Sequence, residues 1–284
     1  MKAIFTLLLT VLFTVLSFAE VSQLEKQALI QFNKSTNGSS WISKWDFSKP
    51  VSTWKGITII NNNVVAINLS DNNLSGTLPN EISNLEFLKT LNLFKNNISG
   101  FIPASIGKLK SLEVLNLSFN KLSGSIPLEI SNATSLNTIE LYMNLLSGEL
   151  PNTIGNLKNL KVLSLYNNLI SGQIPNSLYT IKSLLTLQLN SNKLSGTLNS
   201  EIANLTALEN LSLFDNNFNG QVPFDLEKLN NLKEMNISYN NFEGIVSKKL
   251  YKKDILNMTM VNEYGVATTL KIDLDKNSAL VSED

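Results

Sequence analysis

The feature that most constrains this sequence is an asparagine that returns every 24 residues with no insertion or deletion between copies. The repeated residue is Asn72, Asn96, Asn120, Asn144, Asn168, Asn192, Asn216 and Asn240. A fixed period held over many copies is typical of a solenoid, in which each copy forms one structural unit and stacks on the next. We therefore expect one elongated repeat domain over residues 63–250 rather than several globular domains.

Each copy carries the same apolar pattern before its asparagine. In one copy Leu88, Leu91 and Leu93 precede Asn96, and Gly100 follows it. The alternation predicts a short strand with its leucines turned inward, and stacked copies of that strand form a parallel sheet. The asparagine amide can donate to and accept from backbone groups of its own turn and the next, so we interpret it as structural. The glycine permits a positive φ where the chain bends.

The segment after the glycine returns the chain to the start of the next copy. Apolar residues three apart, such as Ile106, Leu109 and Leu112, predict a helical or 3₁₀ turn on the outer face. Proline opens most of these segments and fixes an extended backbone. Asn199 and Ser247 stand where proline is expected, so we expect a relaxed bend in those two copies.

Residues 122–127 read Leu-Ser-Gly-Ser-Ile-Pro, and this phrase resembles the plant-type, 24-residue leucine-rich repeat. The resemblance extends over about residues 64–250, and residues 20–62, with a helix around Ala28 and the run Trp54-Lys55-Gly56-Ile57, look like the N-terminal cap of that family. It implies an α/β solenoid of eight repeats, with a concave parallel sheet and a helical N-terminal cap. Extracellular members of the family bind peptides, proteins or glycans, but this cap lacks the paired cysteines usual in secreted plant members.

Three residue types are absent from the chain, namely Cys, His and Arg. Thiolate and imidazole metal sites, cysteine nucleophiles and Ser-His-Asp triads are therefore excluded, as are bidentate arginine clamps on phosphate. Charged residues are 16% of the chain and sum to zero, which gives no broad electrostatic footprint for nucleic acid. Abundant Asn and Lys without Arg or His indicate an AT-rich coding genome, so we favour an exported bacterial member of the family.

The two ends of the chain differ from the repeats. Residues 1–19 predict a signal peptide, because Lys2 precedes an apolar run and Ala19 ends a small-residue cleavage site. No later stretch is apolar enough to span a bilayer, so the expected location is secreted, cell-surface or periplasmic.

A tryptophan cluster in residues 20–62 is either a carbohydrate platform or, as we favour, a lid over the open end of the first repeat. Residues 251–284 are a C-terminal cap or tail. Their two strand-like runs predict a hairpin, which closes the array or belongs to an attachment module, and we expect the last ten residues to be disordered.

Function is sought at the strand positions that the repeat leaves free. Exposed aromatics in one patch are favoured at binding hot spots. The candidate ligand-binding residues are Phe94, Phe119, Tyr142, Met143, Tyr166, Glu140, Phe214 and Tyr239. The alternative for Phe119 and Tyr239 is that they are half-buried at the strand end and only pack.

An enzyme built on this surface would depend on carboxylates. Glu113 and Glu140 lie on adjacent strands and could approach the spacing of a glycosidase pair. An open, wet face does not raise a carboxyl pKa as an acid catalyst needs, so we expect no catalysis, cofactor or metal. The leading hypothesis is a binding protein for a protein, peptide or glycan. The alternatives are a structural surface or matrix component and an inhibitor of an extracellular glycan-degrading enzyme.

Overall fold

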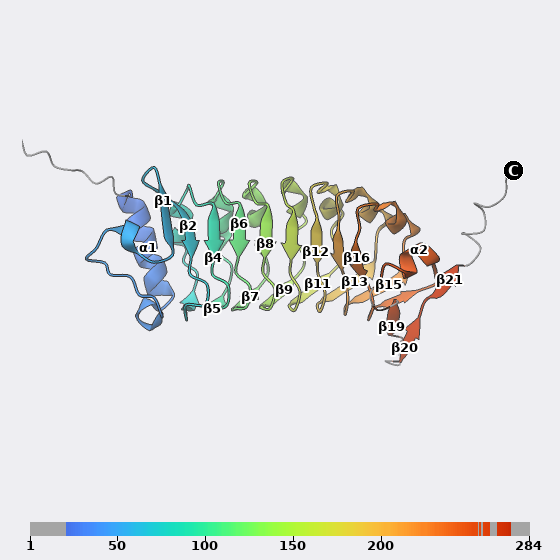
Figure 1. The fold of residues 1–284 in the computed structure, drawn as a ribbon. Coiled ribbons are helices and arrows are strands. Elements are labelled where there is room, and N and C mark those ends of the chain that lie inside the picture. Colours follow the sequence, from blue (N-terminus) through green and yellow to red (C-terminus); the bar gives the residue numbers. More distant parts are fainter. Residues whose placement is uncertain (1–20, 255, 257, 262–265, 274–284) are drawn as a thin grey trace, which may run out of the picture.

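The protein is an elongated stack of repeats with a helix at one end and a small hairpin at the other (Figure 1). The computed structural model describes residues 21–254, 256, 258–261 and 266–273. The expected signal peptide and the last ten residues lie outside this part. Within it, no helix combines the length and apolar character needed to cross a membrane.

The concave face is a nine-stranded sheet whose order follows the chain. Its strands are β1 (Ile57–Ile60), β2 (Asn63–Asn68), β4 (Thr90–Asn92), β6 (Val114–Asn116), β8 (Thr138–Glu140), β10 (Val162–Ser164), β12 (Thr186–Gln188), β14 (Asn210–Ser212) and β16 (Glu234–Asn236). From β2 onward they are parallel and pair one repeat apart, with Leu91 opposite Leu115. Leu91 and Leu93 are fully buried, whereas Phe94 is half-exposed. The predicted concave parallel sheet is confirmed.

A second parallel sheet, which we did not predict, follows each asparagine. Its strands are β3 (Ser75–Thr77), β5 (Asn97–Gly100), β7 (Lys121–Gly124), β9 (Leu145–Gly148), β11 (Leu169–Gly172), β13 (Lys193–Thr197), β15 (Asn217–Gln221) and β17 (Asn241–Glu243). The repeated glycine lies in or next to each of them with φ between 71° and 102°. Only glycine takes such angles readily, so it allows the chain to bend at or near the end of the strand.

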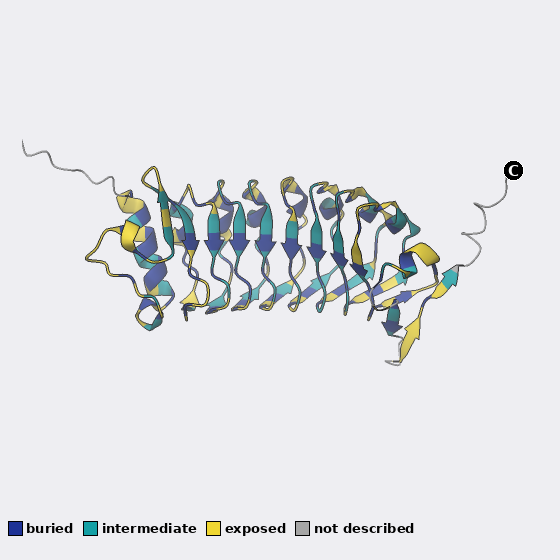
Figure 2. Ribbon diagram, in the orientation of Figure 1, coloured by how far each residue is buried: buried dark blue, intermediate teal, exposed yellow. Residues whose placement is uncertain are grey.

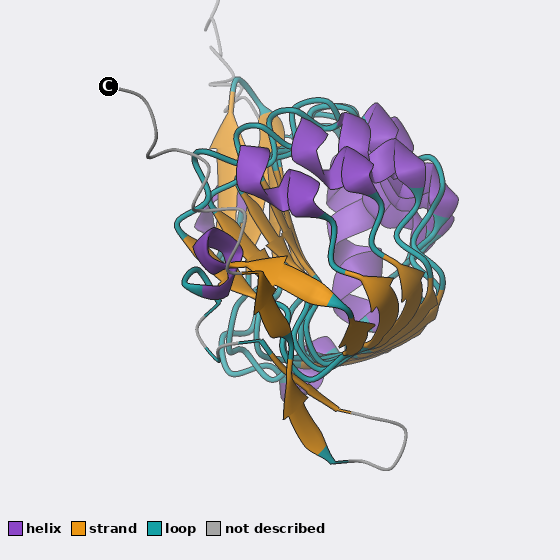
Figure 3. Cartoon of the chain, turned by 90° about the vertical axis from the view of Figure 1, so that its right-hand side faces the viewer, coloured by secondary structure: helices purple, strands orange, loops and turns teal. Residues whose placement is uncertain are grey.

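The return segments form 3₁₀ helices on the outer face, as the three-residue spacing predicts (Figure 3). They are η3 (Asn80–Asn84), η4 (Ala104–Lys108), η5 (Leu128–Asn132), η6 (Ile154–Asn156), η7 (Asn176–Thr180), η8 (Ser200–Asn204) and η9 (Phe224–Lys228). The relaxed bend expected at Asn199 is wrong. Asn199 has φ −70° and ψ 140°, nearly the angles of Pro175, because its side chain accepts a hydrogen bond from Glu201 N at 2.9 Å. Ser247 likewise keeps an extended backbone and caps the short helix α2 (Lys248–Tyr251).

The eight asparagines form a buried ladder along the interior. The Asn144 Nδ2 atom donates to the carbonyls of Leu141 and Leu117, both at 3.0 Å, and its Oδ1 atom accepts from Leu122 N at 2.9 Å. Leu117 and Leu122 belong to the preceding repeat, whereas we expected the next one. Every rung thus ties a repeat to the one before it. Figure 2 shows buried residues recurring at the same place in each repeat.

The N-terminal end is closed by helix α1 (Gln23–Ser35), with η1 (Gly38–Ser40) and η2 (Val51–Thr53). Trp41, Trp45 and Trp54 are buried, and the last two stack at 4.9 Å between ring centroids. They form the core of this end, so the sugar-platform interpretation is wrong. The buried Glu25 carboxylate accepts a hydrogen bond from Val64 N at 2.9 Å, which ties α1 to β2.

The C-terminal end is covered by residues after the last repeat. β19 (Thr259–Val261) and β20 (Ala267–Thr269) pair as an antiparallel hairpin, and β21 (Lys271–Asp273) pairs with β18 (Ile245–Ser247). The buried Asp254 carboxylate accepts from Ile237 N at 2.7 Å. In the preceding repeat the equivalent amide, Leu213 N, donates to the carbonyl of Asn236. The Asp254 side chain therefore takes the place of the next strand's backbone.

Candidate ligand-binding surface

The candidate residues lie just beyond the ends of the concave strands, in two adjacent columns. One column, two positions before each ladder asparagine, holds Phe94, Tyr142, Tyr166 and Phe214. The other, directly before the asparagine, holds Phe119, Met143 and Tyr239. We call the second one the turn column. Backbone hydrogen bonds continue here from repeat to repeat, as from Phe119 N to the Tyr142 carbonyl at 3.0 Å. The side chains of both columns therefore keep the register of the sheet.

Four of these residues form a contiguous aromatic cluster, which we define as Phe94, Phe119, Tyr142 and Tyr166. Phe119 meets Phe94 at 5.3 Å and Tyr142 at 5.7 Å between ring centroids, both edge to face. Tyr142 and Tyr166 stack at 4.4 Å with an angle of 9° between their planes. Such pairs contribute about 0.5–1.5 kcal/mol each beyond the burial of their area. The cluster covers four consecutive repeats.

The two columns interleave to make this cluster continuous. In the third repeat the position equivalent to Phe94 and Tyr142 is Ser118, which is fully buried. The aromatic residue of that repeat is its neighbour Phe119, whose ring contacts both Phe94 and Tyr142. A small residue in one column is thus compensated by a large one in the other.

Every residue of the turn column has a left-handed backbone, with φ between 51° and 57°. Asn and Asp accept this conformation readily, and they occupy it at Asp71, Asn167 and Asp215. Phe119, Met143 and Tyr239 do not, because bulky side chains are disfavoured there. These three side chains are also exposed, at 39%, 37% and 44%. Phe119 and Tyr239 also contact neighbouring rings, so ligand contact by these two residues stays a prediction.

A second, smaller pair lies toward the C-terminal end of the same face. Phe214 and Tyr239 contact each other at 5.1 Å between ring centroids. A shallow hollow of about 110 Å³ lies on the same sheet between β12, β14 and β16, with Gln188, Ser212 and Glu234 in its lining. Phe214 lies two repeats beyond Tyr166, so these two rings are separate from the aromatic cluster.

Glu140, the last residue of β8, adjoins the two stacked tyrosines. Its Oε2 atom accepts a hydrogen bond from Asn116 Nδ2 at 2.7 Å. Burial raises the pKa of Glu140, and burial together with the charge of Glu140 raises the pKa of Tyr142. The pKa of Tyr166 is raised mainly by burial. Glu113 differs, because it forms an ion pair with Lys89 at 3.0 Å. The two carboxylates therefore do not share the environment of a catalytic pair.

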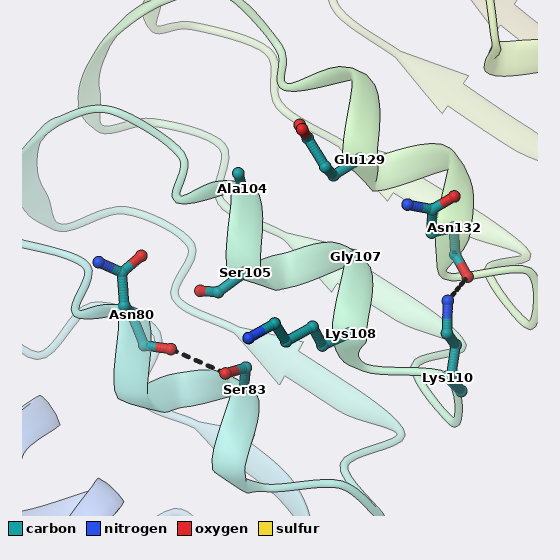
Figure 4. Close-up of a pocket in the computed structure, with 9 residues that line it drawn as sticks. All are labelled: Asn80, Ser83, Ala104, Ser105, Gly107, Lys108, Lys110, Glu129 and Asn132. Atoms are coloured by element: carbon teal, nitrogen blue, oxygen red, sulfur yellow. Dashed lines mark hydrogen bonds between the residues drawn. The ribbon is translucent and has the colours of Figure 1, made fainter.

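A larger hollow, of about 590 Å³, lies on the outer face between η3, η4 and η5 (Figure 4). Its lining is polar and includes Ser105, Lys108, Lys110 and Glu129. The sequence analysis did not predict this hollow. The feature of the sequence that indicates it is weak, namely two small residues in its lining, Ala104 and Gly107. No group of His, Cys, Asp and Glu suited to a metal ion occurs in the described part of the chain.

Two family models match the sequence. One, described as leucine-rich repeat region, matches residues 142–269, and the other, described as leucine rich repeat, matches residues 62–122. The crystal structure of the BIR3–SERK2 complex from Arabidopsis thaliana is 32% identical in sequence, with a TM-score of 0.51. The alignment covers 55% of this chain and 87% of that one. The chain belongs to the leucine-rich-repeat family.

Other proteins resemble the chain over different spans. A plant peptide hormone receptor, RGFR1 in complex with RGF2, is 30% identical with a TM-score of 0.64, over 73% of this chain and 32% of that one. A plant ice-binding protein is 25% identical with a TM-score of 0.72, over 89% of this chain and 81% of that one. A probable leucine-rich-repeat receptor-like serine/threonine-protein kinase from Arabidopsis thaliana is 41% identical over 69 residues. The match spans 24% of this chain and 11% of that kinase. Neither family model describes an enzyme.

Proposed function

We propose that this leucine-rich-repeat protein binds an extended peptide or protein segment through the aromatic cluster of its concave face, without catalysis. The observation that carries the proposal is the cluster itself: Phe119 is held exposed in a strained left-handed turn and joins three other rings. Strain of this kind costs about 1–3 kcal/mol and is concentrated at functional sites. The two edge-to-face contacts of Phe119 offset a cost of this size, and they leave the ring exposed to a ligand.

The arrangement of the rings favours a peptide over a glycan. A sugar ring binds best against an open aromatic face. The facing sides of Tyr142 and Tyr166 cover each other, and Phe119 adds an edge-to-face contact to Tyr142. The surface instead offers ring edges, hydroxyl groups and apolar area. These suit the side chains and backbone of a polypeptide.

Relatives support a peptide or protein partner. The matched structures include a peptide hormone receptor with its ligand and the BIR3–SERK2 protein complex. A plant ice-binding protein is also among the matched structures, and the second sheet is the other extended surface of this chain. There the exposed column varies through Thr77, Phe101, Glu149 and Gln173, and the Ser99 hydroxyl donates to the Gly76 carbonyl at 3.2 Å. A surface that changes size and charge at each repeat does not favour recognition of a regular lattice.

The test uses the variant with Tyr142→Ala and Tyr166→Ala. Peptides are first selected on the wild-type protein from a displayed random library, and the best is then titrated against each protein. We expect the double variant to lose at least about tenfold in affinity, because both anchors are removed. Phe101→Ala is the matched control, since Phe101 is 70% exposed on the second sheet of the same stack. Unchanged affinity in a double variant with native circular dichroism would contradict the proposal.

Export is part of the same proposal. The matched receptor ectodomains and the signal-like residues 1–19 both support an extracellular location. Protein recovered from the medium or periplasm of the source cell should begin at Glu20. N-terminal sequencing checks this, and an intact Met1 on exported protein would contradict it.

A further inference from the structure

The carboxylates of the concave face differ in whether a lysine pairs with them. Three carboxylates there form ion pairs with lysines one repeat away: Asp71 with Lys95 at 3.2 Å, Glu113 with Lys89 at 3.0 Å, and Glu209 with Lys233 at 2.7 Å. Glu140 has no lysine partner within the described part of the chain. It is nevertheless the carboxylate that adjoins the aromatic cluster.

The environment of Glu140 makes this missing partner costly. The side chain is half-buried, and burial raises its pKa, so the ionised carboxylate is poorly solvated there. A single hydrogen bond, from Asn116 to Oε2, is the contact that the described residues give it. A partly desolvated carboxylate gains most from an added cation, because the attraction is screened less than at an exposed site.

The stacked tyrosines beside it also favour a cation. A phenol oxygen carries negative charge and accepts hydrogen bonds from an ammonium or guanidinium group. The charge of Glu140 contributes to raising the pKa of both Tyr142 and Tyr166, so the three groups lie near one another. Phe94 and Phe119 continue the same surface without a charge of their own.

We propose that the ligand is an extended peptide with a basic side chain, whose ammonium or guanidinium group binds Glu140 beside Tyr142 and Tyr166 while an apolar side chain rests on Phe94 and Phe119. This rests on the proposed function and names its ligand class. The two subsites are two repeats apart, about 10 Å at ~4.8 Å per strand. An extended chain covers that distance in about three residues at ~3.3 Å each, so the basic and apolar residues stand about three positions apart.

The first experiment determines the composition of bound peptides. A displayed random library is selected on the wild-type protein, on Glu140→Gln and on Glu129→Gln. Glu129 lies on the outer face of the preceding repeat, in the hollow of Figure 4, so it gives the same charge change away from the rings. We expect enrichment of Lys or Arg about three positions from an apolar residue on the wild type and on Glu129→Gln. The basic residue should lose its enrichment on Glu140→Gln.

The second experiment measures the coupling directly. The best selected peptide and its analogue with the basic residue replaced by Gln are titrated against wild type and Glu140→Gln. We expect each single change to weaken binding about tenfold, and the second change to add little once the first is made. Wild-type affinity should also fall as salt is raised.

The outcomes separate the two proposals. Peptides that depend on Tyr142 and Tyr166 but are neutral or acidic, and bind Glu140→Gln as well as wild type, would overturn the basic ligand and leave peptide binding standing. Selection that yields no peptide dependent on the two tyrosines would overturn both.

Discussion

At the scale of single residues, the turn column is where folding and binding place opposite demands on the same position. The fold needs a left-handed backbone before each ladder asparagine. Asn or Asp meets that need with little cost, whereas Phe119, Met143 and Tyr239 meet it under strain. All three bulky side chains are exposed. The residue type at this position therefore differs between repeats although the backbone conformation is the same in all of them.

A stability measurement tests this strain. Met143→Asn should stabilise the protein by about 0.5–1 kcal/mol, because Asn tolerates the left-handed region and Met143 contributes no ring contact to the cluster. The reverse change in the next repeat, Asn167→Met, should destabilise by a similar amount, and urea unfolding measures both. Equal stability of wild type and Asn167→Met would show that the turn column carries no strain.

Glu140 gives a prediction with a defined pH dependence. Its folded pKa is raised above the unfolded value, so its ionisation favours the unfolded state. Glu140→Gln keeps an acceptor for the Asn116 amide. At pH 7 it should raise the free energy of unfolding by on the order of a few tenths of a kcal/mol after solvent screening, and the melting temperature slightly. Below the unfolded pKa, about 4.3, wild-type Glu140 is protonated in both states and the gain should vanish. A gain that instead grows as pH falls would contradict the assignment.

At the scale of the elements, the sequence predicts what recurs in every copy. The concave strands and the 3₁₀ helices follow from apolar spacing. The second sheet could not be predicted in this way, because its strands of three to five residues present at most one buried side chain, such as Ile98, between polar neighbours. The bend at Asn199 is mispredicted because a side-chain hydrogen bond replaces the fixed φ of proline.

The candidate residues could be named from the sequence for the same reason, since the repeat leaves their positions free. Their geometry relative to one another could not be predicted from the sequence. The stack of Tyr142 on Tyr166 depends on side-chain rotamers, and the place of Phe119 depends on a turn conformation that its residue type disfavours. The unpaired state of Glu140 depends in turn on which lysines reach which carboxylates.

The ladder allows a direct test of an element. Asn144→Ala removes three buried hydrogen bonds and leaves the Leu117 carbonyl and the Leu122 amide with one partner fewer. We expect a loss of about 2–5 kcal/mol in the free energy of unfolding. The exposed Asn152 serves as control, and Asn152→Ala should stay within about 0.5 kcal/mol of wild type. Chemical denaturation of both variants measures this, and equal effects would refute a structural ladder.

At the scale of the whole molecule, a stack of repeats is stable only if both ends are closed. Here each end uses one buried carboxylate to accept a backbone amide: Glu25 from Val64, and Asp254 from Ile237. Asp254 also accepts from Ser238 Oγ at 2.9 Å and from Met258 N at 3.0 Å. We propose that the residues around Asp254 act as a cap.

Because each repeat contacts only its neighbours, damage to one end should stay local. Asp254→Ala should speed amide hydrogen exchange in β16 and η9 while leaving β4 unchanged. Glu25→Gln should affect β2 and α1 and spare β16. Hydrogen-exchange mass spectrometry resolves the two patterns. A uniform increase along the chain would show that the stack unfolds as a single unit instead.

The closed C-terminal edge also bears on how the protein behaves at high concentration. A parallel sheet that stops at β16 would present a row of free amide and carbonyl groups, to which the edge strand β1 of another molecule could add. Contacts of that head-to-tail kind do not close on themselves and grow into filaments. The Asp254 carboxylate and the Thr259 carbonyl, which accepts from Tyr239 N at 2.6 Å, occupy those groups within the same molecule. A short segment after the last repeat thus occupies backbone groups through which copies of this stack could add to one another.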